Sequence, residues 1–284
     1  MSDCEKAMKN SHMNLWFPQW QGGGQDLSTH SGGIVIKEHY LTGMKLEEVE
    51  VATEKIRAVK NDIFGYDEIY TQLESAKKLI EAYQPKTIFT VGGGCDADIP
   101  SASYLNGLLD GKMTLLYFDS HGDLNTPESS GSKHFYGMPL RALLGEGDKG
   151  ILELICLHFK NRQVITLGMR DLDKAEAEYI ADSKLKGFRV DEIEENADAV
   201  IAAVRLIGYR DIYIHIDLDV LDPEEFPDVP VPVKGGMKNE SLLKLLKKLS
   251  DEFRIIGLGL FEYGANENKN DKMIKEIVKI GVGL

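Results

Sequence analysis

Two stretches of the chain place acidic residues and a histidine at alternate positions directly after apolar runs. Leu115 to Asp123 has the sequence LLYFDSHGD, and Ile212 to Pro223 has the sequence IYIHIDLDVLDP. Alternate residues of an extended chain point to the same side. Each stretch is therefore predicted to be a buried strand that delivers polar side chains together at its end. These side chains are Asp119, His121, Asp123, Asp217 and Asp219.

The chemistry that such a cluster supports is metal binding. Carboxylates crowded at two neighbouring strand ends repel one another, and each costs on the order of several kcal/mol to bury unless a cation lies between them. Oxygen-rich ligation with an imidazole favours Mn²⁺, Mg²⁺ or another hard octahedral cation over a structural zinc. Bridging carboxylates would allow two ions roughly 3.5 Å apart. The alternative is that the aspartates cap strands and that His121 is a loop residue, but two such motifs favour the metal.

Composition limits the class of protein. The 284 residues, 43% of them hydrophobic, can bury a full core, and we expect a single domain over residues 1–284 with a possible irregular arm at 1–33. A net charge of −13 argues against binding to nucleic acid and suits a small cationic substrate. No apolar stretch is long enough for a membrane span, and no signal peptide is recognised. The three scattered cysteines, of which Cys4 is the first, suit a cytoplasmic protein.

Alternating strand and helix patterns surround the two motifs. The predicted strands are Thr87–Val91, Met113–Phe118, Gln163–Met169, Ile212–Ile216 and Arg254–Leu260, and Asn14–Trp20 is a first strand or a docked arm. The predicted helices are Leu46–Val59, Ile69–Tyr83, Pro100–Leu109, Ile193–Ile207 with Gly208 as its cap, Ser241–Leu249 capped by Asn239, and Asp271–Ile280.

This alternation predicts a three-layer α/β/α fold with a mostly parallel central sheet. In such sheets, ligands bind outside the carboxyl ends of the strands. The polar residues that close predicted strands are Cys95, Asp119, Asp173, Asp217 and Glu262. The candidate site is therefore expected at this edge of the sheet.

Three motifs together resemble the ureohydrolase superfamily, which includes arginase, agmatinase and formimidoylglutamase. The family motifs are Gly-Gly-x-His, Asp-Ala-His-x-Asp and Ser-x-Asp-x-Asp-x-x-Asp-Pro. Here they are GGGC at Gly92 to Cys95, DSHGD at Asp119 to Asp123, and HIDLDVLDP at His215 to Pro223. The resemblance implies an arginase-like fold, a divalent metal centre with one or two ions, most often Mn²⁺, and assembly as a homo-oligomer, either a trimer or a hexamer.

The resemblance also implies roles for individual residues. Asp119 and Asp217 would bridge two metals, His121 and Asp219 would complete one position, and Asp123 would serve the other. Glu262 would pair with a substrate guanidinium, and Asp222 would support the turn. The loop between Leu124 and Gly137 is arginase-like. The resemblance implies that an amino acid substrate would contact Asn125, Ser130 and Ser132 of this loop. It would also contact Asp173, which follows the loop in the chain.

Two residues depart from the family pattern. The family's first metal ligand, a histidine, is Cys95 here, and the histidine implied to shuttle protons is Tyr136. Cys95 is either a thiolate ligand, which would favour Zn²⁺, Fe²⁺ or Ni²⁺ over Mn²⁺, or a buried structural thiol. Tyr136, with an ordinary pKa near 10, is a poor proton shuttle at neutral pH. His134 is a candidate substitute for it, or a solvated loop residue.

The resemblance implies a metal-dependent hydrolase of a guanidino or amidino C–N bond, in which metal-bound hydroxide attacks and a urea-type product leaves. The catalytic candidates are Glu262, Asp123, His134 and Tyr136. A degenerate protein that keeps the fold for binding or regulation is the alternative. A third hypothesis, a nucleophilic amidohydrolase built on Cys95 and His121, leaves the surplus carboxylates unexplained.

Overall fold

The central element of the computed structural model is an eight-stranded sheet with the order β2-β1-β5-β10-β9-β6-β7-β8, in which every pair of neighbouring strands is parallel. The structure describes residues 12–56, 58–264 and 272–284. The strands are β1 (His12–Phe17), β2 (Glu47–Glu48), β5 (Thr87–Gly92), β6 (Met113–Phe118), β7 (Val164–Leu167), β8 (Lys186–Phe188), β9 (Asp211–Asp217) and β10 (Arg254–Phe261). A separate hairpin pairs β3 (Val59–Lys60) with β4 (Ile63–Phe64).

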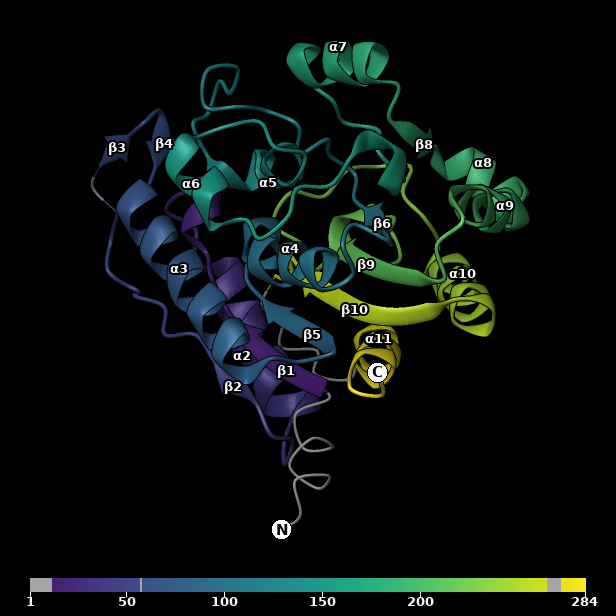
Figure 1. The fold of residues 1–284 in the computed structure, drawn as a ribbon, viewed down its shortest axis with the longest axis horizontal. Helices are drawn as coiled ribbons and strands as arrows, with labels where there is room; N and C mark the ends of the chain where they lie inside the picture. The colour runs from purple at the N-terminus through teal and green to yellow at the C-terminus, as the bar shows by residue number, and fades with distance from the viewer. Residues whose placement is uncertain (1–11, 57, 265–271) are drawn as a thin grey trace.

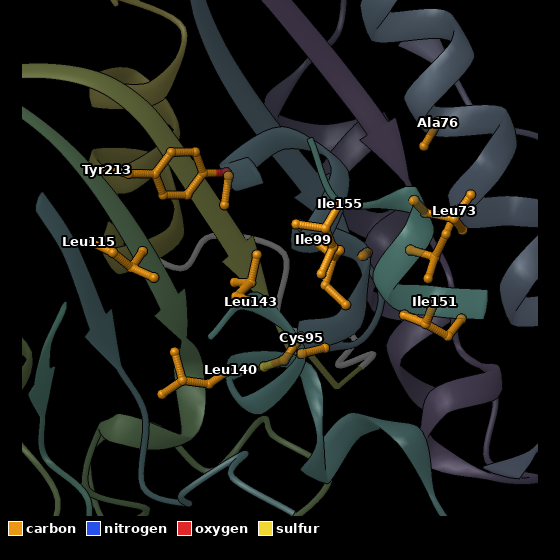
Figure 2. Packing of buried hydrophobic residues seen from close by; sticks show 14 of the residues in the cluster. Leu73, Ala76, Cys95, Ile99, Leu115, Leu140, Leu143, Ile151, Ile155 and Tyr213 are labelled. Carbon is orange, nitrogen blue, oxygen red and sulfur yellow. The ribbon is translucent and has the colours of Figure 1, made fainter. Parts of the chain in front are cut away.

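Helices cover both faces of the sheet (Figure 1). They are α2 (Ser28–Tyr40), α3 (Tyr66–Tyr83), α4 (Ile99–Leu108), α5 (Pro139–Leu143), α6 (Lys149–Leu154), α7 (Lys174–Ser183), α8 (Val190–Glu195), α9 (Ala197–Ile207), α10 (Asn239–Glu252) and α11 (Lys272–Gly281). One apolar core lies between the sheet and α3 to α6, and Figure 2 shows part of it. The other lies between the sheet and α2, α9, α10 and α11. The predicted three-layer α/β/α class is confirmed.

The strands that carry the two motifs are buried on both faces. In β9, Ile212, Ile214 and Ile216 pack into the core on the α9 side. Tyr213 faces the α3 side, where it shares a core with Leu115 of β6. Because successive side chains alternate between the faces, His215 and Asp217 lie on the same side as Tyr213. That side is where the candidate site forms.

Several predicted elements differ from the observed ones. Leu46–Val59 is not a helix: it contains β2 and a loop, and its apolar stripe arises because Val49 and Ile56 are buried by irregular chain. Within the predicted arm, residues 12–33 are ordered as β1 and the start of α2. The predicted helix Ile193–Ile207 is two helices, α8 and α9, that meet at Asn196, while Gly208 is the left-handed cap as expected.

The predicted ends of the last two helices are compared next with the observed ones. Asn239 is the first residue of α10 and its side chain makes no capping hydrogen bond, because Lys238 occupies the cap position. The first residue of the predicted last helix, Asp271, lies outside the described residues, as does Cys4. None of the described helices combines the length and apolar character needed to cross a bilayer.

Candidate metal centre

The candidate site lies at the carboxyl ends of four adjacent strands. β5, β10, β9 and β6 are neighbours in that order, and they lead respectively to Cys95, Glu262, Asp217 and Asp119. The turn after β5 is closely packed, because a Cβ atom on Gly92 would lie 1.9 Å from the backbone oxygen of Phe17, and one on Gly93 would lie 1.4 Å from that of Gln19. Glycine at these positions lets the chain bring Cys95 to the centre of the site.

One group of ligand atoms comes from Asp119, His121 and Asp219, whose atoms lie within 4.8 Å of one another. His121 Nδ1 is 2.8 Å from Asp219 Oδ2. Backbone amides hold the carboxylates: His121 N donates to Asp119 Oδ1 at 2.7 Å, and Asp219 N donates to Asp217 Oδ1 at 2.7 Å. The short turns after β6 and β9 therefore orient the carboxylates of Asp119 and Asp217.

A second group comes from Cys95, Asp217 and Glu262. Cys95 Sγ donates to Asp217 Oδ2 at 3.1 Å, and the backbone N of Cys95 donates to Glu262 Oε1 at 3.3 Å. Asp123 accepts a hydrogen bond from Tyr117 at 2.6 Å. Asp123 and Glu262 both have positive φ angles, 53° and 57°. Such non-glycine conformations are held by their surroundings and cluster at functional sites.

The carboxyl groups perturb one another strongly. Burial is the larger cause, and repulsion from Asp219 the next, of a raised pKa at Asp119. The same two causes raise the pKa of Asp217 well above the ordinary value. Burial, followed by the charge of Asp217, also raises the pKa of Cys95 well above the ordinary value. Burial lowers the pKa of His121, but hydrogen bonds to Asp119 and Asp219 outweigh it and raise this pKa to about 12. The cluster therefore favours bound positive charge.

These residues fit a divalent cation. The two ligand groups supply carboxylate oxygens, an imidazole and a thiol from side chains that are mostly buried. A lysine or arginine in the site would compete with a cation. Among the residues that the structure describes, none lines the cavity next to these groups. The acidic side chains of the two motifs lie close together, as expected from the sequence.

A cavity of about 150 Å³ opens onto both ligand groups. Its lining includes Cys95, His121, Asp123, Asp217, Asp219 and Glu262, together with His134 and Tyr136. Tyr136 is half-buried, and burial followed by the charge of Glu262 raises its pKa. The rings of His134 and Tyr136 are in edge contact, with centroids 5.6 Å apart. Burial lowers the pKa of His134.

A second cavity, of about 290 Å³, adjoins the first and shares His121, Asp123 and Tyr136 with it. It is lined by the residues implied to bind an amino acid, Asn125, Ser130, Ser132 and Asp173. Asn125 Nδ2 donates to Asp173 Oδ2 at 2.7 Å. Asp173 does not close a strand as predicted, but caps α7 by accepting from Glu176 N at 3.0 Å. The hydroxyls of Ser130 and Ser132 accept from the backbone within their own loop.

A family model of known proteins covers nearly all of this structure. The model described as the arginase family matches residues 24–280. The chain belongs to the arginase family. Its curated relatives include the arginase of Staphylococcus aureus strain MRSA252, which is 30% identical over 84% of this chain and 80% of the relative. The arginase of Bacillus subtilis strain 168 is 31% identical over 60% of each chain.

Solved structures share the same fold as this arginase-family chain. Entamoeba histolytica arginase, solved in complex with L-ornithine, superposes with a TM-score of 0.83 at 17% identity and covers 96% of this chain and 97% of its own. Formimidoylglutamase from Bacillus subtilis superposes with a TM-score of 0.70 at 16% identity, covering 96% of this chain and 84% of its own. These similarities confirm the arginase-like fold.

The site of this arginase-family chain contains residues that sequence reasoning did not single out. His215 and Tyr117 lie beneath the acidic cluster on β9 and β6, and Asp98 faces them from the turn after β5. Arg170 donates to the backbone oxygens of Asp219 and Val233, at 2.8 and 2.7 Å, and so holds the proline-rich loop after β9. Only His215 carried a sequence signal, because it occupies the serine position of the third motif.

The same loop is braced at its other end. Asp222 accepts hydrogen bonds from the backbone N atoms of Glu224, Gly235 and Gly236, at 2.9, 3.0 and 3.0 Å. These bonds, led by the one from Glu224, lower the pKa of Asp222. Asp222 therefore has the turn-supporting position that the resemblance implied.

Proposed function

We propose that this protein is a metal-dependent hydrolase that cleaves a guanidino or amidino C–N bond in a small cationic substrate. The observation that carries the proposal is the convergence of two metal-binding groups, joined by Asp217 and Asp219, on a cavity that also contains Glu262. Membership of the arginase family supports the same reaction class. The relatives named arginase support a guanidino substrate over other amidines.

The residues that would hold a cation are Asp119, His121, Asp217 and Asp219. The position beside His121 and Asp219 is rich in oxygen donors and suits manganese. When bound, such ions make water a better nucleophile at neutral pH and stabilise negative charge that develops during attack.

The chain's own residues would bind and orient the substrate. Burial, followed by the charge of Asp219, raises the pKa of Glu262 well above its ordinary value. A guanidinium in the cavity would favour the ionised form of Glu262, because an opposite charge nearby lowers a carboxyl pKa. The pair would then orient the scissile carbon toward the carboxylate cluster. The adjoining cavity, with Asn125 and Asp173, would receive the remainder of an amino acid substrate.

Proton transfer would fall to Asp123, and hydrogen bonding to the substrate would fall to Tyr136. Asp123, held by Tyr117, lies within the ligand cluster and in its ionised form would accept the proton that the attacking water loses. Tyr136 keeps its proton at neutral pH because its pKa is raised. We therefore assign it hydrogen bonding to the substrate rather than proton transfer. His134 is half-buried, burial lowers its pKa, and its ring is in edge contact with the ring of Tyr136.

The test is to load purified protein with manganese, zinc, iron(II) or nickel and to assay urea and ammonia release. The substrates would be arginine, agmatine, other guanidino acids and formimidoylglutamate. Hydrolysis that needs metal and is lost in D119N supports the proposal. A protein that binds metal yet releases neither product from any of them contradicts it and supports the binding or regulatory alternative. Activity that survives metal removal and is abolished by iodoacetamide supports the Cys95 nucleophile instead.

A further inference from the structure

His215 lies in the sheet beneath the acidic cluster, and its ring is held in one orientation. His215 is fully buried on β9, two residues before Asp217 and on the same face. Its ring stacks on Tyr117 with centroids 3.9 Å apart and planes within 3°, and on Phe261 with centroids 5.0 Å apart. The ring is therefore pre-positioned, and only its two nitrogens remain to be accounted for.

One nitrogen of His215 is committed to a buried carboxylate. His215 Nδ1 lies 2.8 Å from Asp98 Oδ2, and Tyr213 donates its hydroxyl to the other oxygen of Asp98. A carboxylate accepts in this pair, so Nδ1 carries a proton, and in the neutral ring Nε2 then carries the lone pair. A histidine that donates one nitrogen to a carboxylate and presents the other is the usual arrangement of a metal ligand.

The second nitrogen has no protein partner. Within the described part of the chain, His215 Nε2 is buried and makes no hydrogen bond. Leaving a buried acceptor unsatisfied costs about 1–3 kcal/mol. A ligand atom of His215 lies within 4.8 Å of ligand atoms of both Cys95 and Asp119. Because Nδ1 is occupied by Asp98, Nε2 is the nitrogen that faces this group.

The sequence shows the same exchange of positions. The motif that ends at Cys95 has cysteine where the family motif has histidine, and the motif that begins at His215 has histidine where the family motif has serine. One imidazole is absent from the turn after β5, and another is present on β9 beside it. The two departures are complementary.

We propose that His215 Nε2 is a metal ligand, and that together with Cys95 Sγ, Asp119 and Asp217 it forms a mixed thiolate, imidazole and carboxylate position. This inference rests on the metal-dependent function proposed above. Asp98 is a positioning residue that fixes the tautomer of His215. A thiolate and an imidazole select softer divalent ions, so this position would prefer Zn²⁺, Fe²⁺, Co²⁺ or Ni²⁺ over Mn²⁺.

The direct test is X-ray absorption at the zinc edge on full-length protein loaded with a single equivalent of zinc. We expect one sulfur at about 2.3 Å and one imidazole nitrogen at about 2.0–2.1 Å. In H215S the imidazole signal should disappear while the sulfur remains, and zinc affinity measured by chelator competition should fall at least about tenfold. His158→Asn is the matched control, because His158 also has an unpartnered Nε2 but lies outside the site.

A double variant tests the exchange without relying on the stability of H215S. In C95H/H215S the imidazole moves to the turn after β5, and we expect zinc binding without sulfur and with higher affinity than in either single variant, because the two substitutions are coupled. Sulfur without imidazole in the unmodified protein, or unchanged affinity in folded H215S, would overturn the inference, as would failure of the unmodified protein to bind zinc.

The inference and the proposed function fail separately. If the zinc protein shows both sulfur and imidazole but hydrolyses no guanidino or formimidoyl compound, His215 is a ligand and the proposed reaction is wrong. If the loaded protein hydrolyses a guanidino compound and H215S binds zinc as well as the unmodified protein does, the reaction is right and His215 is a core residue.

Discussion

Among single residues, Glu262 is the one whose substitution distinguishes substrate binding from metal binding. Its carboxylate accepts from the backbone of Cys95 and lines the cavity, so it can serve either partner. We expect E262Q to lower kcat/KM for a guanidino substrate about 100-fold, because a hydrogen bond to a charged group contributes about 1.5–3 kcal/mol. Metal content, measured by elemental analysis, should stay unchanged.

The control for E262Q is E178Q, which removes an exposed carboxylate that pairs with Lys174 on the surface of α7. It should leave both kcat/KM and metal content unchanged. If E262Q loses a metal equivalent together with activity, Glu262 is a ligand and its assignment to the guanidinium is wrong.

Tyr136 gives a second prediction, on pH dependence. Its raised pKa means that the hydroxyl does not titrate in the neutral range. We expect Y136F to raise KM about threefold to tenfold through the loss of one hydrogen bond. The alkaline limb of the pH–rate profile should keep its position, and a limb that vanishes in Y136F would show that this hydroxyl transfers protons.

At the scale of elements, the strands were more predictable than the helices. Met113–Phe118 was predicted with its observed limits, because a mostly apolar run between turn residues leaves little choice. Leu46–Val59 has helical spacing of apolar residues, yet tertiary packing of a loop produces the same pattern. Helix α2 was not predicted, because its sequence has no helical stripe of apolar residues. Its buried face consists of Thr29, two glycines and Ile36.

The candidate site shows the same limit. The carboxylates and His121 could be predicted because they lie in short motifs after strands. The pairing of His215 with Asp98 could not, because these residues are 117 positions apart and meet only through the sheet order. Sequence also does not reveal that Asn125 is held by Asp173, since that contact depends on where α7 begins.

The glycine turn after β5 carries a prediction at this scale. A Cβ atom on Gly93 would lie 1.4 Å from the backbone oxygen of Gln19, so the two segments would have to separate. We expect G93A to lower the free energy of unfolding by about 1–3 kcal/mol and to weaken metal binding, because Cys95 would be displaced. Chemical denaturation and chelator competition measure the two effects.

The control for G93A is G107A, in α4, where the nearest atom would be 3.4 Å from the new Cβ atom. Alanine favours a helix more than glycine does, by about 1 kcal/mol, so G107A should be neutral or stabilising. Equal stability of G93A and the unmodified protein would mean that the turn can move and does not fix the site.

At the scale of the whole molecule, the acidic cluster makes stability depend on pH. Folding raises the pKa values of Asp119, Asp123, Asp217 and Glu262 by burial, and raises that of His121 to about 12. A group whose pKa is raised in the folded state stabilises that state below its unfolded pKa, and this contribution is lost as pH rises through the folded value.

We therefore expect the Tm of chelator-treated protein to fall as pH rises from about 5 to about 8, the window in which the unfolded carboxyl groups have already lost their protons. Added divalent metal should reverse the slope, because ligands bind metal more tightly once deprotonated. Differential scanning calorimetry with and without metal measures both curves. A Tm that rises with pH in the chelator-treated protein would show that the cluster is not strained by its own charge.

The single-domain organisation, the cytoplasmic location and the homo-oligomeric assembly stay predictions at this scale. The overall parallel order of the sheet, by contrast, follows from the regular alternation of strands and helices, and it explains why the candidate metal ligands reach one edge.

The position of β10 in the sheet has a consequence for biosynthesis. β10 is the last strand along the chain, yet it lies between β5 and β9 rather than at an outer edge. In a nascent chain that ends at β9, the place of β10 in the sheet is empty. β5 and β9 therefore each lack one neighbouring strand. Completion of the interior, and with it the assembly of Glu262 beside Cys95, has to wait until residues 254–262 leave the ribosome. The group of Cys95, Asp217 and Glu262 is therefore complete only after translation of this strand, whereas the group of Asp119, His121 and Asp219 does not depend on it.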